Sequence, residues 1–172
     1  MTVAAGATVD ATDIVDLQGK TTGRPLVKLI QQVAQTGITT GSDTVLTFGS
    51  GSEDIDTHGY HDTATNNSRV TPQLAGYYRL TVRPILAFNT TTTAGHGFVR
   101  KNGTIVERGG NSKPTGTVNV NVGLGEFSTI LSANGTTDYF EAGFQVTATA
   151  NQATNVTAGS ASVFIVEFIR PL

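Results

Sequence analysis

The sequence predicts an all-β protein: a single antiparallel β-sandwich or barrel of about ten short strands, preceded by an extended N-terminal arm. The composition is the first indication, because the 172 residues include 29 threonines and 20 glycines. Threonine favours pleated strands, and glycine supplies the positive φ angles that tight turns need. From Arg24 onward, short apolar runs alternate with turn residues at intervals of about ten residues, as in a sandwich. The length fits one domain with its own core.

The first 23 residues differ from the rest of the chain. They are small, polar and aperiodic, with scattered apolar anchors at Val9, Ile14, Val15 and Leu17. Such a segment cannot enclose a core, so it is expected to be an arm that is disordered or ordered only against a neighbour. Fully extended, it would reach roughly 75 to 80 Å. We therefore divide the chain into an arm (1–23) and a β-sandwich domain (24–172).

The strands expected in the domain follow from these apolar runs. They are residues 26–32, 44–48, 68–71, 76–88, 95–101, 104–109, 117–122, 126–132, 138–149 and 161–170. The run 26–35 (LVKLIQQVAQ) also has apolar spacing and flanking residues that suit a helix, but the surrounding segments favour a strand. Asn102-Gly103 lies between two apolar pairs and predicts a two-residue hairpin turn.

Two strands indicate how their faces are used, because side chains alternate along an extended chain. In 138–149, Phe140, Ala142, Phe144 and Val146 form a core face, and Tyr139, Glu141, Gly143 and Gln145 form a solvated one. The last strand carries Phe164, Val166 and Phe168 on one side and Val163, Ile165 and Ile169 on the other. Both of its faces are expected to be buried. In a sandwich only one face of each sheet packs into the core, so a second apolar face needs another partner. A contact between subunits is therefore expected at Val163, Ile165 and Ile169.

Composition also excludes several classes of function. The chain has no cysteine, which excludes disulfides, thiolate nucleophiles, zinc fingers and iron–sulfur clusters. Its 11 basic and 13 acidic residues give a net charge of −2, which does not suit nucleic-acid binding. No apolar run is long enough for a membrane span, and no signal peptide is evident, so neither a membrane partner nor export is expected.

Four motifs follow one another along the chain: 72–78 (PQLAGYY), 100–103 (RKNG), 137–141 (TDYFE) and a phenylalanine-rich last strand. Their order resembles that of the trimeric jelly-roll heads of the complement and tumour necrosis factor superfamily, in the form found in bacteriophage structural proteins. The segments 54–62 (DIDTHGYHD) and 66–71 (NNSRVT) resemble the phage form in particular. The resemblance covers about residues 24–172 and does not include the arm.

This resemblance implies that residues 24–172 form a single antiparallel jelly-roll β-sandwich of about eight to ten strands. It also implies a homotrimer on a virion, as a capsid decoration protein, a head fibre or a tail-fibre tip. The major capsid protein would be the partner, and the arm anchors Val9, Ile14, Val15 and Leu17 would contribute to attachment. The protein would be made in the host cytoplasm and would lie on the outer capsid surface. One departure concerns the strand that follows Gly76, where Tyr77, Arg79, Thr81 and Arg83 form a polar face. Residues at a three-fold axis are therefore not assigned to this strand.

The alternative is a receptor- or carbohydrate-binding head of a fibre, with a host-surface glycan as its partner. It would use the loops 50–67 and 109–116 and exposed aromatic residues such as Tyr60. The sequence has no heptad or collagen-like stalk before the head, and this favours the decoration role.

Neither catalysis nor metal binding is expected of this chain, and no cofactor is assigned. Five potential ligands, Asp54, Asp56, His58, His61 and Asp62, lie within nine residues. They are better explained as a polar loop in which aspartates accept turn amides and histidines cap or pack. No nucleophile elbow of the Gly-x-Ser-x-Gly type is present, and no pair of glutamates can be placed at a glycosidase separation from sequence, so the chain is not expected to be an enzyme.

Overall fold

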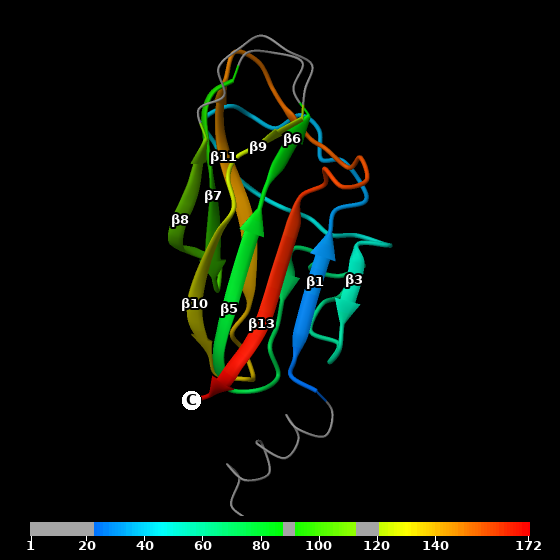
Figure 1. Ribbon diagram of the computed structural model, residues 1–172, viewed down its shortest axis with the longest axis vertical. Coiled ribbons are helices and arrows are strands. Elements are labelled where there is room, and N and C mark those ends of the chain that lie inside the picture. Colours follow the sequence, from blue (N-terminus) through cyan, green and yellow to red (C-terminus); the bar gives the residue numbers. More distant parts are fainter. Residues whose placement is uncertain (1–22, 88–91, 113–120) are drawn as a thin grey trace, which may run out of the picture.

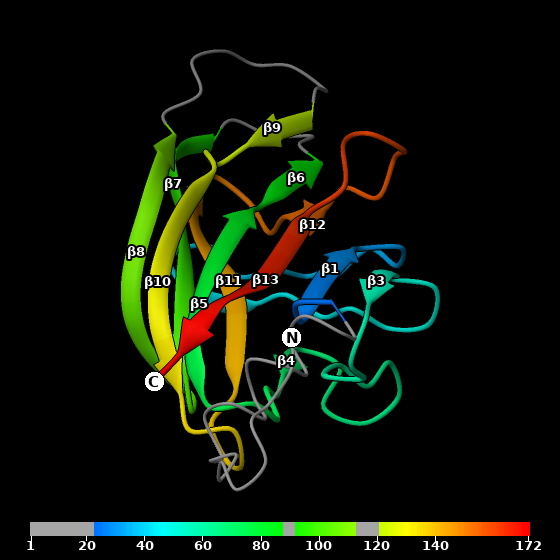
Figure 2. The same ribbon diagram turned by 60° about the horizontal axis from the view of Figure 1, so that its bottom comes forward.

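The computed structural model describes residues 23–87, 92–112 and 121–172, and these residues form a β-sandwich without helices (Figures 1 and 2). The arm residues 1–22 lie outside the described part, so the boundary expected at residue 23 remains a prediction. The strands are β1 (Leu26–Ile30), β2 (Asp43–Val45), β3 (Glu53–Asp56), β4 (Arg69–Val70), β5 (Gly76–Arg83), β6 (Ile85–Ala87), β7 (Thr92–Lys101), β8 (Thr104–Ser112), β9 (Asn121–Gly123), β10 (Phe127–Ala133), β11 (Phe140–Ala148), β12 (Ala153–Thr154) and β13 (Val163–Pro171).

Two antiparallel sheets form the sandwich. The first has the order β10-β5-β13-β1-β3, so that the first and last long strands of the domain lie side by side at its centre. The second has the order β2-β11-β7-β8, with β4 also paired to β11. Figure 1 shows the five-stranded sheet in front of β7, β8 and β11, and a small third sheet, β12-β6-β9, at the end opposite the C-terminus. This architecture confirms the predicted jelly-roll fold class.

The segment 26–35 begins as a strand, and the helical alternative is wrong. Val27 and Leu29 are buried in the core, whereas the residues between and beside them are half-buried. This alternation has the period of two that a strand imposes. Pairing with β13 on one side and β3 on the other satisfies the backbone of β1.

Several strand boundaries differ from the predicted ones. The segment 76–88 is not one strand, because Pro84 separates β5 from β6 and has no N–H group to continue the ladder. Its last residue, 88, lies outside the described part, as does most of the predicted strand 117–122. The strands β3 and β12 were not predicted: β3 has the polar sequence EDID, and β12 has two residues.

The hairpin predicted at Asn102-Gly103 is confirmed. Both residues have positive φ angles, 52° and 79°, as a type I′ turn requires. The turn joins β7 to β8, with Lys101 paired opposite Thr104. The backbone N–H of Asn102 also donates to the carbonyl of Tyr139, so the turn is attached to the start of β11.

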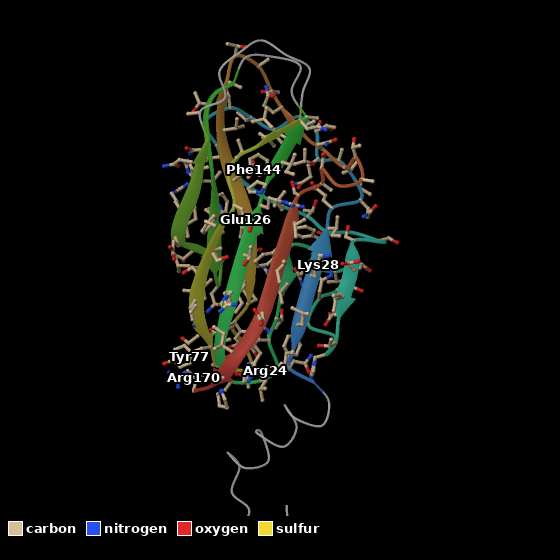
Figure 3. All side chains as sticks on the ribbon, in the orientation of Figure 1. Arg24, Lys28, Tyr77, Glu126, Phe144 and Arg170 are labelled. Atoms are coloured by element: carbon tan, nitrogen blue, oxygen red, sulfur yellow. The ribbon has the colours of Figure 1, made fainter. Side chains whose placement is uncertain are left out.

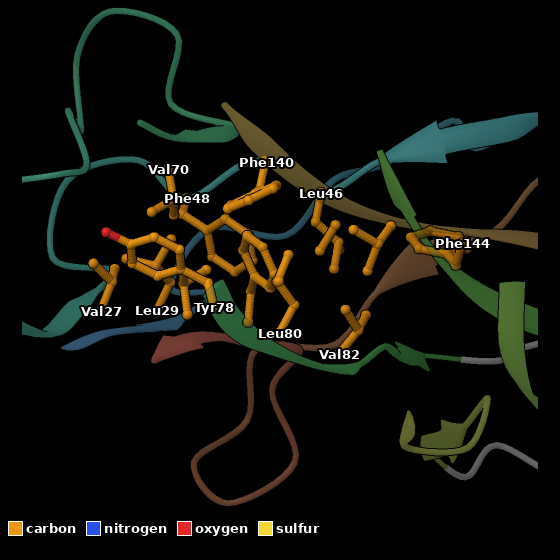
Figure 4. Close-up of a cluster of buried hydrophobic side chains, with 14 of the residues drawn as sticks. Val27, Leu29, Leu46, Phe48, Val70, Tyr78, Leu80, Val82, Phe140 and Phe144 are labelled. Atoms are coloured by element: carbon orange, nitrogen blue, oxygen red, sulfur yellow. The ribbon is translucent and has the colours of Figure 1, made fainter. Parts of the chain in front are cut away.

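The core lies between the two sheets and is rich in aromatic rings (Figure 4). Tyr78 is fully buried, with its ring centre 5.3 Å from that of Phe168 and 6.1 Å from that of Phe140. Its hydroxyl donates to the carbonyl of Leu74 at 2.7 Å, which satisfies the one polar group that it brings into the core. These rings, from β5 and β13 of one sheet and β11 of the other, pack the two sheets together.

The core face predicted for 138–149 is confirmed, because Phe140, Ala142, Phe144 and Val146 are all fully buried. The opposite face is not simply solvated. Glu141 is only 6% exposed, and Gly143 is buried as well. Neighbouring side chains of the second sheet cover this face, as described below.

Candidate functional site

The outer face of the five-stranded sheet combines apolar and charged side chains in rows across the strands. Strand pairing places Ile30 opposite Val163, which in turn lies opposite Arg83. The next row contains Ile55, Lys28, Ile165, Thr81 and Ser128 in order across the sheet. Paired residues share a face, so these side chains form one continuous surface on the side of the sheet away from the core.

A shallow cavity of about 270 Å³ lies on this face. Val163 and Ile165 of β13 line it together with Ile30 of β1, and its charged side chains are those of Lys28, Arg83 and Glu126. The Nε–H group of Arg83 is buried and finds no acceptor among the described residues. A buried donor without an acceptor is unusual, because leaving it unpaired costs about 1–3 kcal/mol.

Most other charges on this face are paired within the subunit. The Nζ atom of Lys28 lies 2.7 Å from a carboxylate oxygen of Asp54, and Arg79 lies 3.2 Å from Glu167. These pairs reduce the charge that the face presents, although each is too exposed to stabilise the fold greatly. Figure 3 draws the side chains of this face, with Lys28 and Glu126 labelled.

Two of the three residues predicted for a subunit contact share this cavity. Val163 is 7% exposed and Ile165 is half-buried, and both lie on the outer face. Thus β13 is buried in the core through one face, while its other face is only partly covered within the subunit. Ile169 is set apart from the other two, because the pairing of β13 with β5 shifts register between Phe168 and Arg170. The arm anchors Val9, Ile14, Val15 and Leu17 lie outside the described residues.

Sequence reasoning missed other residues of this surface. Ile30 and Arg83 line the same cavity, and Ile130 of β10 is 56% exposed opposite Arg79. A signal for Ile130 existed in the alternation of 127–133, where Ser128, Ile130 and Ser132 share one face. The cavity itself had no such signal, because it depends on pairing between distant strands.

The outer face of the second sheet is dominated by Phe98. This ring is fully buried although it does not belong to the core between the sheets. It lies over Gly143, and its outward side is covered by the guanidinium groups of Arg100 and Arg108, at 5.1 and 5.7 Å from the ring centre. Cation–π contacts of this kind hide an apolar ring from water.

An ion pair extends this cluster to the edge strand β2. Arg108 donates to both carboxylate oxygens of Asp43, at 2.8 and 2.9 Å, and these hydrogen bonds lower the pKa of Asp43. Arg108 also contacts Nε2 of His96 at 2.8 Å. A guanidinium can only donate, so Nε2 accepts and the imidazole is neutral. Burial and the charge of Arg108 both lower the pKa of His96.

Residues 57–62 of the acidic and histidine-rich segment form a hydrogen-bonded loop, as predicted, whereas Asp54 and Asp56 belong to strand β3. Asp56 accepts the backbone N–H groups of His58 and His61 at 3.2 and 2.9 Å. The buried ring of His61 contacts Glu53 at 2.9 Å and the Asn67 carbonyl at 3.2 Å. Within the described residues, no group of three or more such side chains is arranged to hold a metal ion.

Tyr60 is not an exposed aromatic residue, and the prediction that placed it on an accessible loop surface is wrong in this respect. It is only 5% exposed, because its ring packs into the core cluster. Burial raises the pKa of its hydroxyl. The other predicted loop, 109–116, is described only as far as Ser112, and its residues 109–112 belong to strand β8 rather than to a loop. No helix that could cross a membrane occurs in the ranges 23–87, 92–112 and 121–172.

Comparison with known proteins gives a match in fold. No protein family matches the sequence, and no curated protein is similar to it. Among solved structures, a crystal structure of murine APRIL at pH 8.0 matches with a TM-score of 0.58 and 11% identity, and covers 84% of this chain and 99% of its own. Structures of murine APRIL at pH 8.5 and pH 5.0 match with the same coverage, with TM-scores of 0.57 and 0.55 and identities of 11% and 9%.

At these identities the match concerns the fold alone. The chain therefore has the jelly-roll fold of tumour-necrosis-factor-like proteins.

Proposed function

We propose that this chain is a virion structural protein: a homotrimeric decoration protein that binds the outer surface of a bacteriophage capsid and stabilises the shell. Its role is structural rather than enzymatic. The observation that carries the trimer is the second apolar face of β13, where Val163 and Ile165 lie beside a cavity on an outer sheet face. The phage role rests on the sequence resemblance to trimeric jelly-roll heads.

Two features of this outer face support contact with a second copy. The pairs Lys28–Asp54 and Arg79–Glu167 leave few unpaired charges to desolvate when another apolar surface covers them. The unpaired Nε–H of Arg83 could then donate to an acceptor on the neighbouring subunit. A closed ring of three copies would bury this face on every subunit.

The arm provides a physical reason for trimerisation. One arm that orders on binding has weak affinity, because ordering costs conformational entropy. When three arms are attached to one rigid head, binding of the first arm holds the other two near the surface. The second and third arms then bind at an effective concentration on the order of millimolar. Avidity then exceeds the affinity of one arm by roughly 10² to 10⁴-fold. The apolar anchors Val9, Ile14, Val15 and Leu17 would make the capsid contacts.

Co-sedimentation with undecorated particles of the virus that encodes the chain tests this role. We expect the full chain to sediment with the particles, and the chain lacking residues 1–23 to remain in the supernatant as a folded trimer. A matched control replaces Val9, Ile14, Val15 and Leu17 by serine and keeps the arm length. It should also fail to bind. Equal binding by the truncated and full chains would contradict attachment through the arm.

A further inference from the structure

A second cavity, of about 460 Å³, is lined by residues from three connections between strands. The β4–β5 and β10–β11 connections lie at the end of the sandwich that carries the C-terminus (Figure 2). The β3–β4 connection contributes Asp62 and Asn66, strand β4 and the β4–β5 connection contribute Arg69 and Gln73, and the β10–β11 connection contributes Tyr139. Its volume falls within the range of about 300–1,000 Å³ that small-molecule sites occupy. Nearly all of its lining side chains are polar.

Asp62 is held in place by its own loop. Its Oδ1 atom accepts the backbone N–H groups of Ala64 and Thr65 at 2.8 and 3.1 Å, and these bonds lower its pKa. The carboxylate is therefore ionised near neutral pH. Its Oδ2 atom has no hydrogen bond to any described residue, so this atom can accept a ligand hydroxyl.

Arg69 is also fixed in position. Its guanidinium carbon lies 4.0 Å from the centre of the Tyr139 ring, and its Nε atom lies 3.6 Å from Oε1 of the buried Glu141. The stacking and the ion pair orient the guanidinium plane. Its two terminal nitrogens have no hydrogen bond within the described part of the chain and remain able to donate.

Two amide side chains complete the set. Asn66 and Gln73 are exposed at the cavity, and neither side chain hydrogen-bonds to a described residue. Each amide offers an acceptor oxygen and two donor hydrogens. Asn66 adopts φ 56°, a conformation that asparagine and glycine tolerate better than other residues.

The charges of the lining favour a neutral ligand. Asp62 and Arg69 carry opposite charges, and Glu141 already opposes the charge of Arg69. A phosphate would find one partly neutralised arginine facing a carboxylate, which is a poor anion site. An apolar ligand would strip water from amides and a carboxylate without replacing their hydrogen bonds. A polyol, whose hydroxyl groups both donate and accept, satisfies all of these groups together.

We propose that this cavity binds a neutral saccharide, such as one terminal sugar of a surface glycan, through Asp62, Asn66, Arg69 and Gln73. This site is independent of the arm and of the outer sheet face. A decoration protein that carried it would give the capsid a weak affinity for glycans, multiplied by the many copies on one particle.

The test is to titrate sugars into a solution of the isotope-labelled full chain and to monitor the amide chemical shifts by NMR. The probes are glucose, galactose, mannose, N-acetylglucosamine and rhamnose, each raised to tens of millimolar because single-sugar sites bind weakly, and inorganic phosphate for comparison. We expect at least one sugar to shift amides of 59–73 and 137–139 in a saturable way. Phosphate should not produce this pattern. Saturable phosphate shifts there, or no localised shift with any of the five sugars, would overturn the proposal.

Matched variants locate the site. Asn66→Gly keeps the positive φ and removes the amide, and Gln73→Ala removes a side chain without a hydrogen bond to a described residue, so both should fold. Each substitution should raise the dissociation constant of the sugar about fivefold or more, which corresponds to the loss of one hydrogen bond. Thr136→Ala, in the β10–β11 connection but not lining the cavity, should bind normally. Unchanged affinity in both cavity variants would also overturn the proposal. Because the assay uses no capsid, its result is independent of capsid attachment.

Discussion

The side-chain amide of Asn102 donates to the carboxylate of Asp138 at 2.7 Å and so ties the β7–β8 turn to the β10–β11 connection. The other carboxylate oxygen accepts the N–H of Asn134 at 3.0 Å and lies 2.9 Å from Nζ of Lys101. The pKa of Asp138 is lowered, chiefly by the hydrogen bond from Asn102 and further by Lys101 and Asn134. This carboxylate therefore joins two loops that are distant in sequence.

Replacing this carboxylate should make stability depend less on pH. Because the pKa of Asp138 is lower in the folded state than its ordinary value of 3.8, its contribution is present above that value and is lost as the pH falls through the folded pKa. We expect Asp138→Asn to lower the free energy of unfolding by about 1–2 kcal/mol at neutral pH, and by less below pH 4. Denaturant titrations across this range measure the difference.

The variant Asn102→Gly is the matched partner, because glycine keeps the positive φ of the turn and removes the donor amide. In a double-mutant cycle the two substitutions should be non-additive. A loss of stability in Asp138→Asn that is the same at acid and neutral pH would contradict the role given to its charge.

Packing of Phe98 over Gly143 should make this glycine sensitive to substitution. A Cβ atom there would overlap the Phe98 ring and lie 2.5 Å from the carbonyl oxygen of Thr44. We expect Gly143→Ala to cost about 1–3 kcal/mol in the free energy of unfolding. The control is Gly123→Ala in β9, where a Cβ would meet nothing within 4 Å and should change stability little. Equal effects of the two substitutions would show that Phe98 does not lie over Gly143 as described.

Removal of the Arg108 charge should raise the pKa of His96. In the native chain, burial and then Arg108 lower this pKa, and Asp43 acts weakly in the opposite direction. Arg108→Gln removes the repulsive charge and leaves Asp43 without its ion-pair partner, so both changes favour the imidazolium. An NMR titration of the His96 ring in both proteins gives the comparison. A pKa that is unchanged or lower in the variant would disagree with the contacts described here.

Self-association should depend on β13. We expect the full chain to have three times its 17.9 kDa mass in light scattering, and Ile165→Glu to have the mass of a monomer, because the new charge would be buried between copies. Val106→Glu is the matched control, since Val106 is 45% exposed on the opposite sheet. A trimer that survives Ile165→Glu, or a monomeric native chain, would exclude this face as the contact.

Most of the fold could be predicted because local signals and tertiary structure agree. The Asn102-Gly103 turn, the core face of β11 and the alternation of β13 are all visible in short stretches of sequence. Strand β3 could not be found, since its sequence EDID has little apolar content and it forms only by pairing with β1 at the sheet edge. The break at Pro84 follows from proline chemistry but was overlooked within a long apolar segment.

The candidate sites were harder to predict from the sequence than the fold. Val163 and Ile165 could be assigned to an outer face because alternation in one strand is enough. The cavity beside Arg69 forms only because three separate segments lie close together in the fold. The spacing of residues in the sequence does not show which distant segments come together. Tyr60 was misplaced for the same reason: its loop is polar, yet its ring turns inward to the core.

The most direct measurement is the copy number of this chain in purified particles of the virus that encodes it, by quantitative mass spectrometry against the major capsid protein. The decoration role predicts hundreds of copies in a fixed ratio to the shell protein. A few to a few tens of copies would instead indicate a fibre or tail tip. Absence of the chain from the particles would contradict a virion role altogether.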